Sequence, residues 1–363
     1  MSTSKLMEEI LDLARWAPSG DNTQPWRFEP LAPDHLRIHA FDTRDHCVYD
    51  LDGHPSQISI GTLIETISIA ASRHGLRLEH QRRGDAPDDP RPVFDIRFIQ
   101  DRSVKPDPLA DFIKERRVQR RPMQRRLLSE AEKSSLEASV MPRHRVHWIS
   151  GPQARLRVAK LLFHSAHLRL TIPEAYQVHR DVIEWHAQFS KDRIPDQALG
   201  ASPMTVLMMR QVMKSWERVH FFNRFLAGTW AARIELDFIP SLACASHFLL
   251  IPPHPATSIE DYVEAGRSIQ RFWLTAAQLN LQLQPEVTPL VFGRYARERR
   301  EFSARPGATA EASDIRRRLQ KLVGEAAADA AVFMGRVGQG KPASARSTRK
   351  DLADLMISSS ARQ

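Results

Sequence analysis

The stretch Ala14-Arg15-Trp16-Ala17-Pro18-Ser19-Gly20-Asp21-Asn22-Thr23-Gln24-Pro25-Trp26-Arg27-Phe28 is the most informative part of this chain. It follows residues 5–16, in which apolar residues recur at helical spacing, and Pro18 ends that predicted helix. Residues 18–26 then form a polar loop with several hydrogen-bonding side chains within one turn. Gly20 removes side-chain bulk, so the backbone can approach a ligand. Composition alone leaves two interpretations open, a ligand-binding loop or a plain loop that terminates a helix.

The composition predicts a globular, cytoplasmic protein. The chain has 363 residues, of which 42% are hydrophobic and 26% charged, ordinary values for a folded protein. No apolar run approaches the ~20 residues that a membrane helix needs. Acidic residues near the N-terminus occupy the place where a signal peptide is apolar. The two cysteines, Cys47 and Cys244, favour free thiols over a disulfide, and no spacing of histidines and cysteines predicts a metal site.

The net charge of +9 is concentrated in three basic stretches. The densest covers residues 114–126, and the others cover residues 294–300 and 336–350. Such charge suits nucleic acid, an anionic membrane or a phosphate-bearing small molecule. Residues 113–126 lack the aromatic interleaving of an RNA-binding sheet. A solvated basic face or a nucleic-acid patch nevertheless remains open from charge alone.

Hydrophobic periodicity predicts a mixture of helices and strands, and so an α+β fold. The expected helices cover residues 5–16, 57–74, 129–140, 153–190, 203–232, 259–279 and part of 304–331, and the expected strands cover 36–41, 93–99, 145–149 and 246–251. Gly75 suits the left-handed end of a helix, and Ser258 with Asp261 predicts a capping box. Residues 57–80 and 258–283 look like one element used twice, which indicates two similar halves.

The segment 14–28 resembles the Ala-Pro-Ser-x-x-Asn-x-Gln-Pro-Trp segment of the nitroreductase family of FMN enzymes. In that family the segment contributes to the flavin site across a subunit interface. The resemblance implies FMN as cofactor and a nitroreductase-like α+β fold with mainly antiparallel sheets flanked by long helices. The FMN-binding residues that it implies in this loop are Pro18, Ser19, Gly20, Asn22, Gln24 and Trp26.

The densest basic stretch resembles a second feature of the family, an Arg-x-Ser/Thr-x-Arg/Lys signature that grips FMN. The signature usually precedes the loop, whereas here the best match, residues 116–122, follows it. This order resembles the fused, pseudo-dimeric Acg-type branch, in which one chain supplies both halves of the site. If the segment is helical, Arg116 and Arg120 share a face, and we assign them with Arg121 to the phosphate and the flavin edge. Val118 stands where the family has a hydroxyl residue, so a register shifted by one residue is also open.

Further candidates lie near the C-terminus. Gln284-Pro285-Glu286 matches the family position where a backbone amide approaches the flavin N5, so Glu286 is expected to act through its N–H rather than its carboxylate. A simple connection between a helix and a strand is the alternative. Residues 335–340 resemble the closing strand of the family and lack the spacing of a dinucleotide-binding fingerprint. Arg349, in the basic stretch that follows, is a candidate phosphate ligand.

The resemblance predicts two nitroreductase-like halves, residues 1–110 and residues 111–350. A helical insertion at about 200–232 in the second half either packs in the core or covers the flavin as a lid, and residues 351–363 form a flexible tail. One chain would then complete the site as a pseudo-dimeric monomer, and a homodimer remains open.

The expected function is that of an FMN-dependent oxidoreductase. NAD(P)H would donate electrons, and a quinone, a nitroaromatic or another electron-poor small molecule would accept them. Hydride transfer demands no side-chain acid or base, so no catalytic residue is assigned. The alternative is an FMN-sequestering protein with little reductase activity. Neither nucleic acid nor a membrane is expected as a partner.

Overall fold

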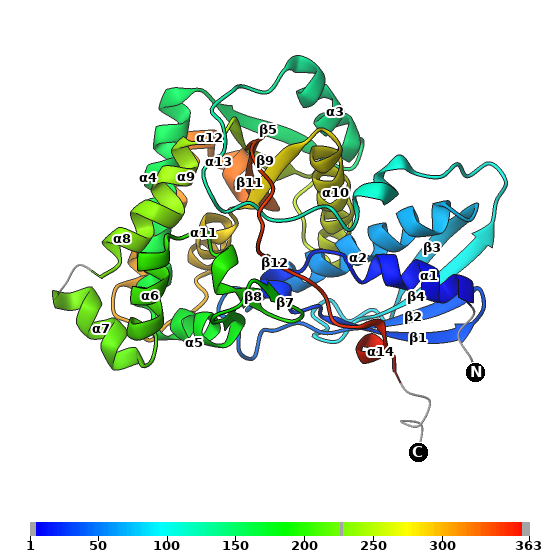
Figure 1. The fold of residues 1–363 in the computed structure, drawn as a ribbon, viewed down its shortest axis with the longest axis horizontal. Helices are drawn as coiled ribbons and strands as arrows, with labels where there is room; N and C mark the ends of the chain where they lie inside the picture. Colours follow the sequence, from blue (N-terminus) through cyan, green and yellow to red (C-terminus); the bar gives the residue numbers. More distant parts are fainter. Residues whose placement is uncertain (1–4, 226–227, 358–363) are drawn as a thin grey trace.

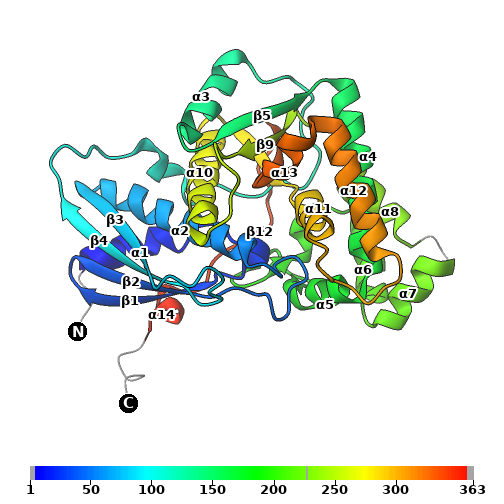
Figure 2. The same cartoon turned by 180° about the vertical axis from the view of Figure 1, so that it is seen from behind.

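The structure is a computed structural model that describes residues 5–225 and 228–357. It is an α+β protein built around two four-stranded sheets (Figures 1 and 2). The α-helices are α1 (Lys5–Ala14), α2 (His54–Ser72), α3 (Glu130–Val140), α4 (Pro152–Thr171), α5 (Pro173–Val182), α6 (Pro203–Val212), α7 (Trp216–Phe225), α8 (Trp230–Arg233), α9 (Ile239–Leu242), α10 (Ile259–Gln278), α11 (Thr288–Glu298), α12 (Ala308–Val323), α13 (Glu325–Ala330) and α14 (Leu352–Leu355). The 3₁₀ turns are η1 (Gly20–Asn22), η2 (Pro108–Phe112) and η3 (Asp196–Ala198), and η4 (Ile234–Phe238) is a π-helical turn. The strands are β1 (Trp26–Ala32), β2 (His35–Ala40), β3 (Leu76–Arg83), β4 (Val93–Gln100), β5 (Arg145–Ser150), β6 (Ile183–Glu184), β7 (Phe189–Ser190), β8 (Ile194–Pro195), β9 (Ser246–Ile251), β10 (Leu281–Pro285), β11 (Phe333–Gln339) and β12 (Arg346–Ser347).

The two four-stranded sheets have the same topology. The first has the order β1-β2-β4-β3 and the second the order β5-β9-β11-β10, and all neighbouring strands in both are antiparallel. In each sheet the first two strands precede one long helix, α2 or α10, and the last two strands follow it. The predicted α+β fold with two similar halves is therefore confirmed. The second half is larger because helices are inserted between β5 and β9 and between β10 and β11.

The repeat holds residue by residue along α2 and α10. Equivalent positions differ by 205 in number, namely the N-caps Gly53 and Ser258, the central residues Gly61 and Gly266, and the positive-φ residues Gly75 and Asn280 after each helix. The constant offset shows that α2 with β3 and α10 with β10 are one element used twice, as the sequence pattern indicated.

Gly61 and Gly266 allow α2 and α10 to cross at close contact in the middle of the molecule (Figure 1). A Cβ atom on Gly61 would lie 1.9 Å from the carbonyl oxygen of Val263, and one on Gly266 would lie 2.0 Å from that of Ile58. Gly61 thus faces Val263, three residues before Gly266, and Gly266 faces Ile58, three residues before Gly61. A local two-fold relation between the two helices requires such reciprocal contacts. Only a residue without a side chain permits this approach of two backbones.

The sheets differ in how they are covered. In the first sheet the side chains alternate along β2, so that Leu36, Ile38 and Ala40 pack on α1 and α2 while the other face is only partly buried. The second sheet is buried on both faces, because every residue of β9 is buried between α10 on one side and the α4–α11–α12 layer on the other. In the described part of the chain, no helix has the length and apolar character that crossing a bilayer requires.

Several sequence predictions need correction. Strands β1 and β3 were not predicted; β1 begins where the loop 18–26 ends, and β3 begins directly after Gly75, the residue expected at the end of the long helix. The single helical stretch expected over 203–232 is divided into α6, α7 and α8, and the helical stretch over 153–190 ends at Val182. The tail expected to be flexible from residue 351 contains α14, whose Leu355 is buried on the first core. Residues 358–363 of that tail lie outside the described residues.

Candidate functional site

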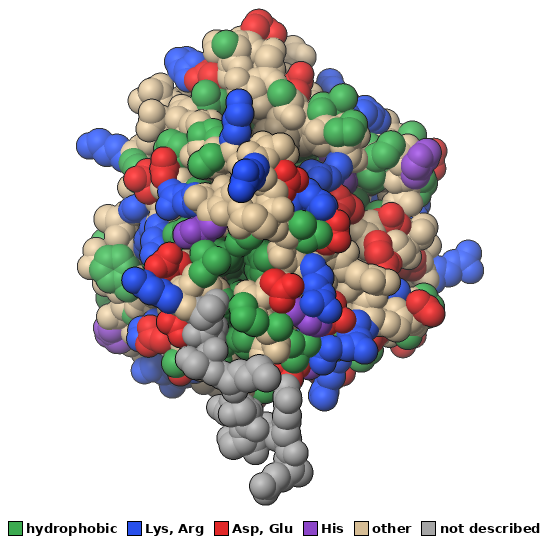
Figure 3. Space-filling model, turned by 90° about the vertical axis from the view of Figure 1, so that its right-hand side faces the viewer, with side chains coloured by type: hydrophobic (Ala, Val, Ile, Leu, Met, Phe, Trp, Pro, Cys, Tyr) green, Lys and Arg blue, Asp and Glu red, His purple; other side chains and the backbone are tan. Residues whose placement is uncertain are grey.

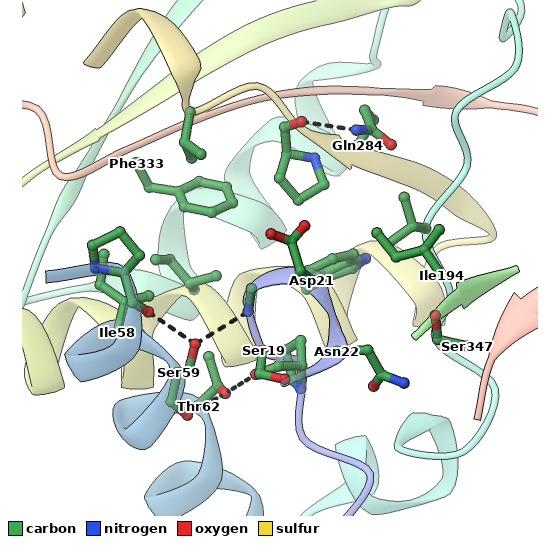
Figure 4. Close-up of a pocket in the computed structure, with 18 of the residues that line it drawn as sticks. Ser19, Asp21, Asn22, Ile58, Ser59, Thr62, Ile194, Gln284, Phe333 and Ser347 are labelled. Carbon is green, nitrogen blue, oxygen red and sulfur yellow. Dashed lines mark hydrogen bonds between the residues drawn. The ribbon is translucent and has the colours of Figure 1, made fainter. Parts of the chain in front are cut away.

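A cavity of about 320 Å³ lies where the two halves meet (Figure 4). Its walls come from the loop after α1, the N-terminal half of α2, the segment 116–120, the middle of α10, the end of β10, the start of β11 and the strand β12. The volume lies in the range of ligand pockets. Nine of the thirteen predicted site residues line it, namely Pro18, Ser19, Gly20, Asn22, Arg116, Arg120, Gln284, Pro285 and Arg349.

The loop after α1 is held in an unusual backbone conformation. Asp21, Asn22 and Gln24 have φ angles of 47°, 62° and 50°, in the left-handed region that non-glycine residues rarely adopt. The Ser19 hydroxyl accepts a hydrogen bond from the Gln24 amide at 3.0 Å, and the Thr62 hydroxyl donates to the Pro18 carbonyl at 2.7 Å. Such locally strained backbone persists where its surroundings fix it, and it is common at binding sites.

Gln24 fixes this loop from behind and does not line the cavity. Its buried amide nitrogen donates to the carbonyls of Asn22 and Lys191, and its oxygen accepts from the Lys350 amide at 2.9 Å. Trp26 is fully buried in the core of the first half. Arg121 also lies outside the cavity wall, with its guanidinium 3.5 Å from the Ala201 carbonyl. None of these three predicted residues therefore lines the cavity, and Gln24 is the one whose hydrogen bonds fix the loop.

The segment that carries Arg116 and Arg120 is extended, so the condition that it be helical is not met. Val118 forms a parallel bridge with Leu283 of β10, and the Gln119 amide donates to the Leu283 carbonyl at 3.1 Å. In an extended chain alternate residues share a side, and Arg116, Val118 and Arg120 all line the cavity, as does the intervening Arg117. Arg116 and Arg120 share a side as expected, but because every second residue of an extended chain points to the same side and not because of helical spacing.

Five arginines of the cavity wall are held by backbone carbonyls. The acceptors are the carbonyls of Trp16 for Arg116, Ala343 for Arg117, Ala198 for Arg120, Lys114 for Arg346 and Ala17 for Arg349. None of the five makes an ion pair with a carboxylate in the described part of the chain. The carbonyls fix the guanidinium groups in place without neutralising their charge, which leaves a strongly positive wall.

The pKa values of these arginines reflect this crowding. Burial and the neighbouring Arg346 and Arg15 lower the pKa of Arg349 to about 9. Burial, with Arg349 and Arg346 close by, holds the pKa of Arg116 well below its usual range. Buried like charges with unpartnered N–H groups, among them the Nε atoms of Arg116 and Arg346, favour an anion beside them.

Asp21 is the one carboxylate among the described residues that line the cavity. Figure 4 shows it projecting from the loop towards the side where Gln284 and Phe333 lie. No described residue donates a hydrogen bond to its carboxylate. Burial raises its pKa, although Arg120 and Arg169 act in the opposite direction. Among the described residues, the loop therefore presents one carboxylate without a hydrogen-bond donor to the cavity.

The remaining wall is apolar and aromatic. Ile58, Trp273, Leu290 and Phe333 line it, and the Arg116 guanidinium lies 4.6 Å from the centre of the Trp273 ring. A planar, largely apolar group with an anionic end matches this combination of walls. Across the described residues, no group of His, Cys, Asp or Glu side chains has the arrangement of a metal site.

The prediction that Glu286 offers its backbone N–H to a ligand is wrong. That N–H donates to the Met334 carbonyl at 2.8 Å, because β10 continues its pairing with β11 at this residue. The carboxylate is buried behind the cavity wall, where it accepts from Arg336 Nη1 at 3.1 Å and lies 2.7 Å from His247 Nδ1. The other ring nitrogen of His247 lies 2.9 Å from the Ser241 carbonyl. Both nitrogens of His247 thus face acceptors, as in a protonated imidazolium.

Sequence reasoning missed several residues of the cavity. Asp21 and Arg346 stand inside motifs that were recognised, so their position next to Gly20 and Arg349 was a usable signal. Ser59 and Trp273 lie on helix faces whose partners only the fold reveals. In the range of the predicted lid, 200–232, the described residues do not line this cavity, whereas Ile194 and Ala198 do.

Comparison with known proteins adds little to this geometry. No family model and no curated protein matches the chain. Among solved structures it is similar to one described as a nitroreductase-like family protein from Bacillus cereus, with 11% sequence identity and a TM-score of 0.34 over 69% of this chain and 95% of that one. With so low an identity and TM-score, we base the proposed function on the cavity alone.

Proposed function

We propose that this protein binds FMN in the cavity and acts as an FMN-dependent oxidoreductase of the nitroreductase type. In this proposal NAD(P)H donates electrons, and a quinone, a nitroaromatic or another electron-poor molecule accepts them. The supporting observation is the positive wall of five arginines without carboxylate partners among the described residues, in a cavity that also has an apolar and aromatic wall. A phosphate monoester is the anion that guanidinium groups bind best. The loop that resembles the nitroreductase-family segment borders the same cavity.

The residues present fit FMN. Arg116, Arg346 and Arg349 would hold the phosphate, while Trp273 and Phe333 would cover the ring system and exclude water. Bound FMN supplies the hydride and electron transfer, which no side chain of this chain provides. The unpartnered amide oxygen of Gln284 lies in the wall and would accept a hydrogen bond from the flavin edge.

A visible absorption spectrum of the purified protein, with FMN added and then with NAD(P)H under anaerobic conditions, tests this proposal. We expect a flavin spectrum that bleaches on reduction and recovers when a quinone is added. A bound flavin that NAD(P)H leaves oxidised would favour the sequestering alternative. If the protein does not retain FMN supplied in excess, the assignment of the cavity fails, and residues 113–126 should then be tested for binding to nucleic acid.

A further inference from the structure

The exposed large hydrophobic residues of this chain gather at one end of the molecule. Seven of the twelve that the structure describes lie between residues 204 and 239. The helices of this region, α6, α7 and α8, lie together at the end farthest from α1 and the first sheet (Figures 1 and 2). Three aromatic residues are the most conspicuous, since Phe221, Phe225 and Trp230 are 52%, 63% and 54% exposed. Burial in the core, one of the two roles predicted for this insertion, does not describe these side chains.

Basic residues accompany the exposed aromatic ones. Arg218, Phe221 and Phe225 follow each other at intervals of three and four residues and so share one face of α7. Lys214, Arg218 and Arg224 are exposed, and Glu217 is the exposed acid among them. We call Lys214, Arg218, Phe221, Arg224, Phe225 and Trp230 the aromatic-basic tip. The opposite end of the molecule differs, because acidic and basic side chains are interspersed over the face in Figure 3.

The charge of the tip identifies the partner that it fits. In a symmetric contact between two copies, the same patch meets itself, so three cations would face three cations with one acid on each side. That arrangement is repulsive. An anionic surface is attracted by the same cations, and aromatic side chains next to Lys and Arg are the composition of segments that lie in the headgroup region of a bilayer.

We infer that the aromatic-basic tip docks on the surface of an anionic lipid bilayer, with Phe221 and Phe225, whose rings lie 5.1 Å apart, inserted among the headgroups. This inference replaces the expectation from the sequence that no membrane is involved. It places the protein on the membrane surface and not across it. It does not rest on the proposed function, because the tip contributes no residue to the cavity wall.

Sedimentation of the full chain with lipid vesicles tests this inference. We expect binding to phosphatidylcholine vesicles that contain phosphatidylserine, weak binding to pure phosphatidylcholine, and loss of binding at high salt. The Phe221→Ser/Phe225→Ser variant should lose the binding. Each of Lys214→Gln, Arg218→Gln and Arg224→Gln should weaken it about fivefold, the effect of ~1 kcal/mol per basic residue near an anionic surface.

Leu127→Ser is the matched control, because Leu127 is a similarly exposed hydrophobic residue outside the tip. Its binding should equal that of the unchanged protein, and the thermal unfolding curves of all variants should coincide. Three results would overturn the inference: equal binding to both kinds of vesicle, binding that survives Phe221→Ser/Phe225→Ser, or a dimer in sedimentation velocity that this double substitution dissociates while vesicles are not bound.

Discussion

The surroundings of Arg116 and Arg349 disfavour the positively charged form of both side chains. Each is buried, close to other arginines and bonded to the carbonyls that follow α1. Carbonyls at the C-terminal end of a helix attract cations, which explains why both guanidinium groups converge there. What this pair lacks is an anion, and a phosphate in the cavity would supply one.

Arg349→Gln tests that role directly. Removing one charged donor should weaken FMN binding about ten- to a hundredfold, the equivalent of ~1.5–3 kcal/mol for a hydrogen bond to a charged group. Riboflavin lacks the phosphate, so its affinity should change little. Fluorescence titration with both flavins measures the difference. Arg126→Gln is the control from the basic stretch 114–126, since Arg126 is paired with Glu132 outside the cavity. Equal losses for FMN and riboflavin in Arg349→Gln would contradict the assignment.

The buried Glu286–His247 pair predicts a particular dependence of stability on pH. Burial alone would lower the pKa of His247, but the carboxylate of Glu286 outweighs it and raises the pKa from 6.5 to about 10. A raised folded-state pKa gives stability that is complete below pH 6.5 and is lost as the pH rises towards 10. Arg336 and His247 lower the pKa of Glu286 against the effect of burial, so its contribution is lost only in acid, below pH 4.5.

Glu286→Gln should remove that dependence. We expect the free energy of unfolding to fall by about 3–5 kcal/mol at pH 6, the usual effect of breaking a buried ion pair, and its decline between pH 6.5 and 10 to flatten. Urea denaturation across this pH range measures both effects. An unchanged slope in the variant would show that another group is responsible.

At the scale of elements, local signals in the sequence were reliable and distant ones were not. The capping box of Ser258 with Asp261 is formed as its spacing indicated, because a cap depends on residues within one turn. The conformation of residues 116–120 was left open by the sequence, because it is set by the pairing of Val118 with Leu283, far away in the sequence. The same holds for the site. The loop motif was recognisable in the sequence, whereas Trp273 of α10 lines the cavity only because α10 packs beside it in the fold.

The crossing of α2 and α10 makes a prediction at this scale. Gly61→Ala or Gly266→Ala would place a methyl group about 2 Å from a backbone carbonyl of the other helix, so the helices must separate. The expected loss is about 1–3 kcal/mol or more, measured by denaturant unfolding. Gly293→Ala is the control within α11, because its added Cβ atom meets nothing closer than 3.6 Å; there, alanine should be neutral or slightly stabilising. A similar loss at Gly293 would show that backbone propensity, and not the crossing, is being measured.

At the scale of the whole molecule, the repeat provides two equivalent positions, and among the described residues the cavity is bordered by the one on α2. Ser59 and Thr62 of α2, which line the cavity, correspond through the offset of 205 to Glu264 and Arg267 of α10. Arg267 lies 2.8 Å from both Glu264 and Glu65, and Arg143 also pairs with Glu264. Ion pairs thus fill the position on α10, whereas small hydroxyl side chains border the cavity at the equivalent position on α2.

We therefore predict one FMN per chain, bound by a monomer that supplies every residue of the site. Titration with FMN, followed by quenching of flavin fluorescence and combined with sedimentation to fix the oligomeric state, measures this stoichiometry. Ser59→Glu introduces on α2 the residue that stands at the equivalent position of α10, Glu264. It places a carboxylate where the Ser59 hydroxyl now accepts a hydrogen bond from the Gly20 amide. That variant should fold and lose FMN binding, whereas Ser59→Ala should retain it. Two FMN molecules per chain, or normal affinity in Ser59→Glu, would mean that these two positions on the helix pair do not decide where the flavin binds.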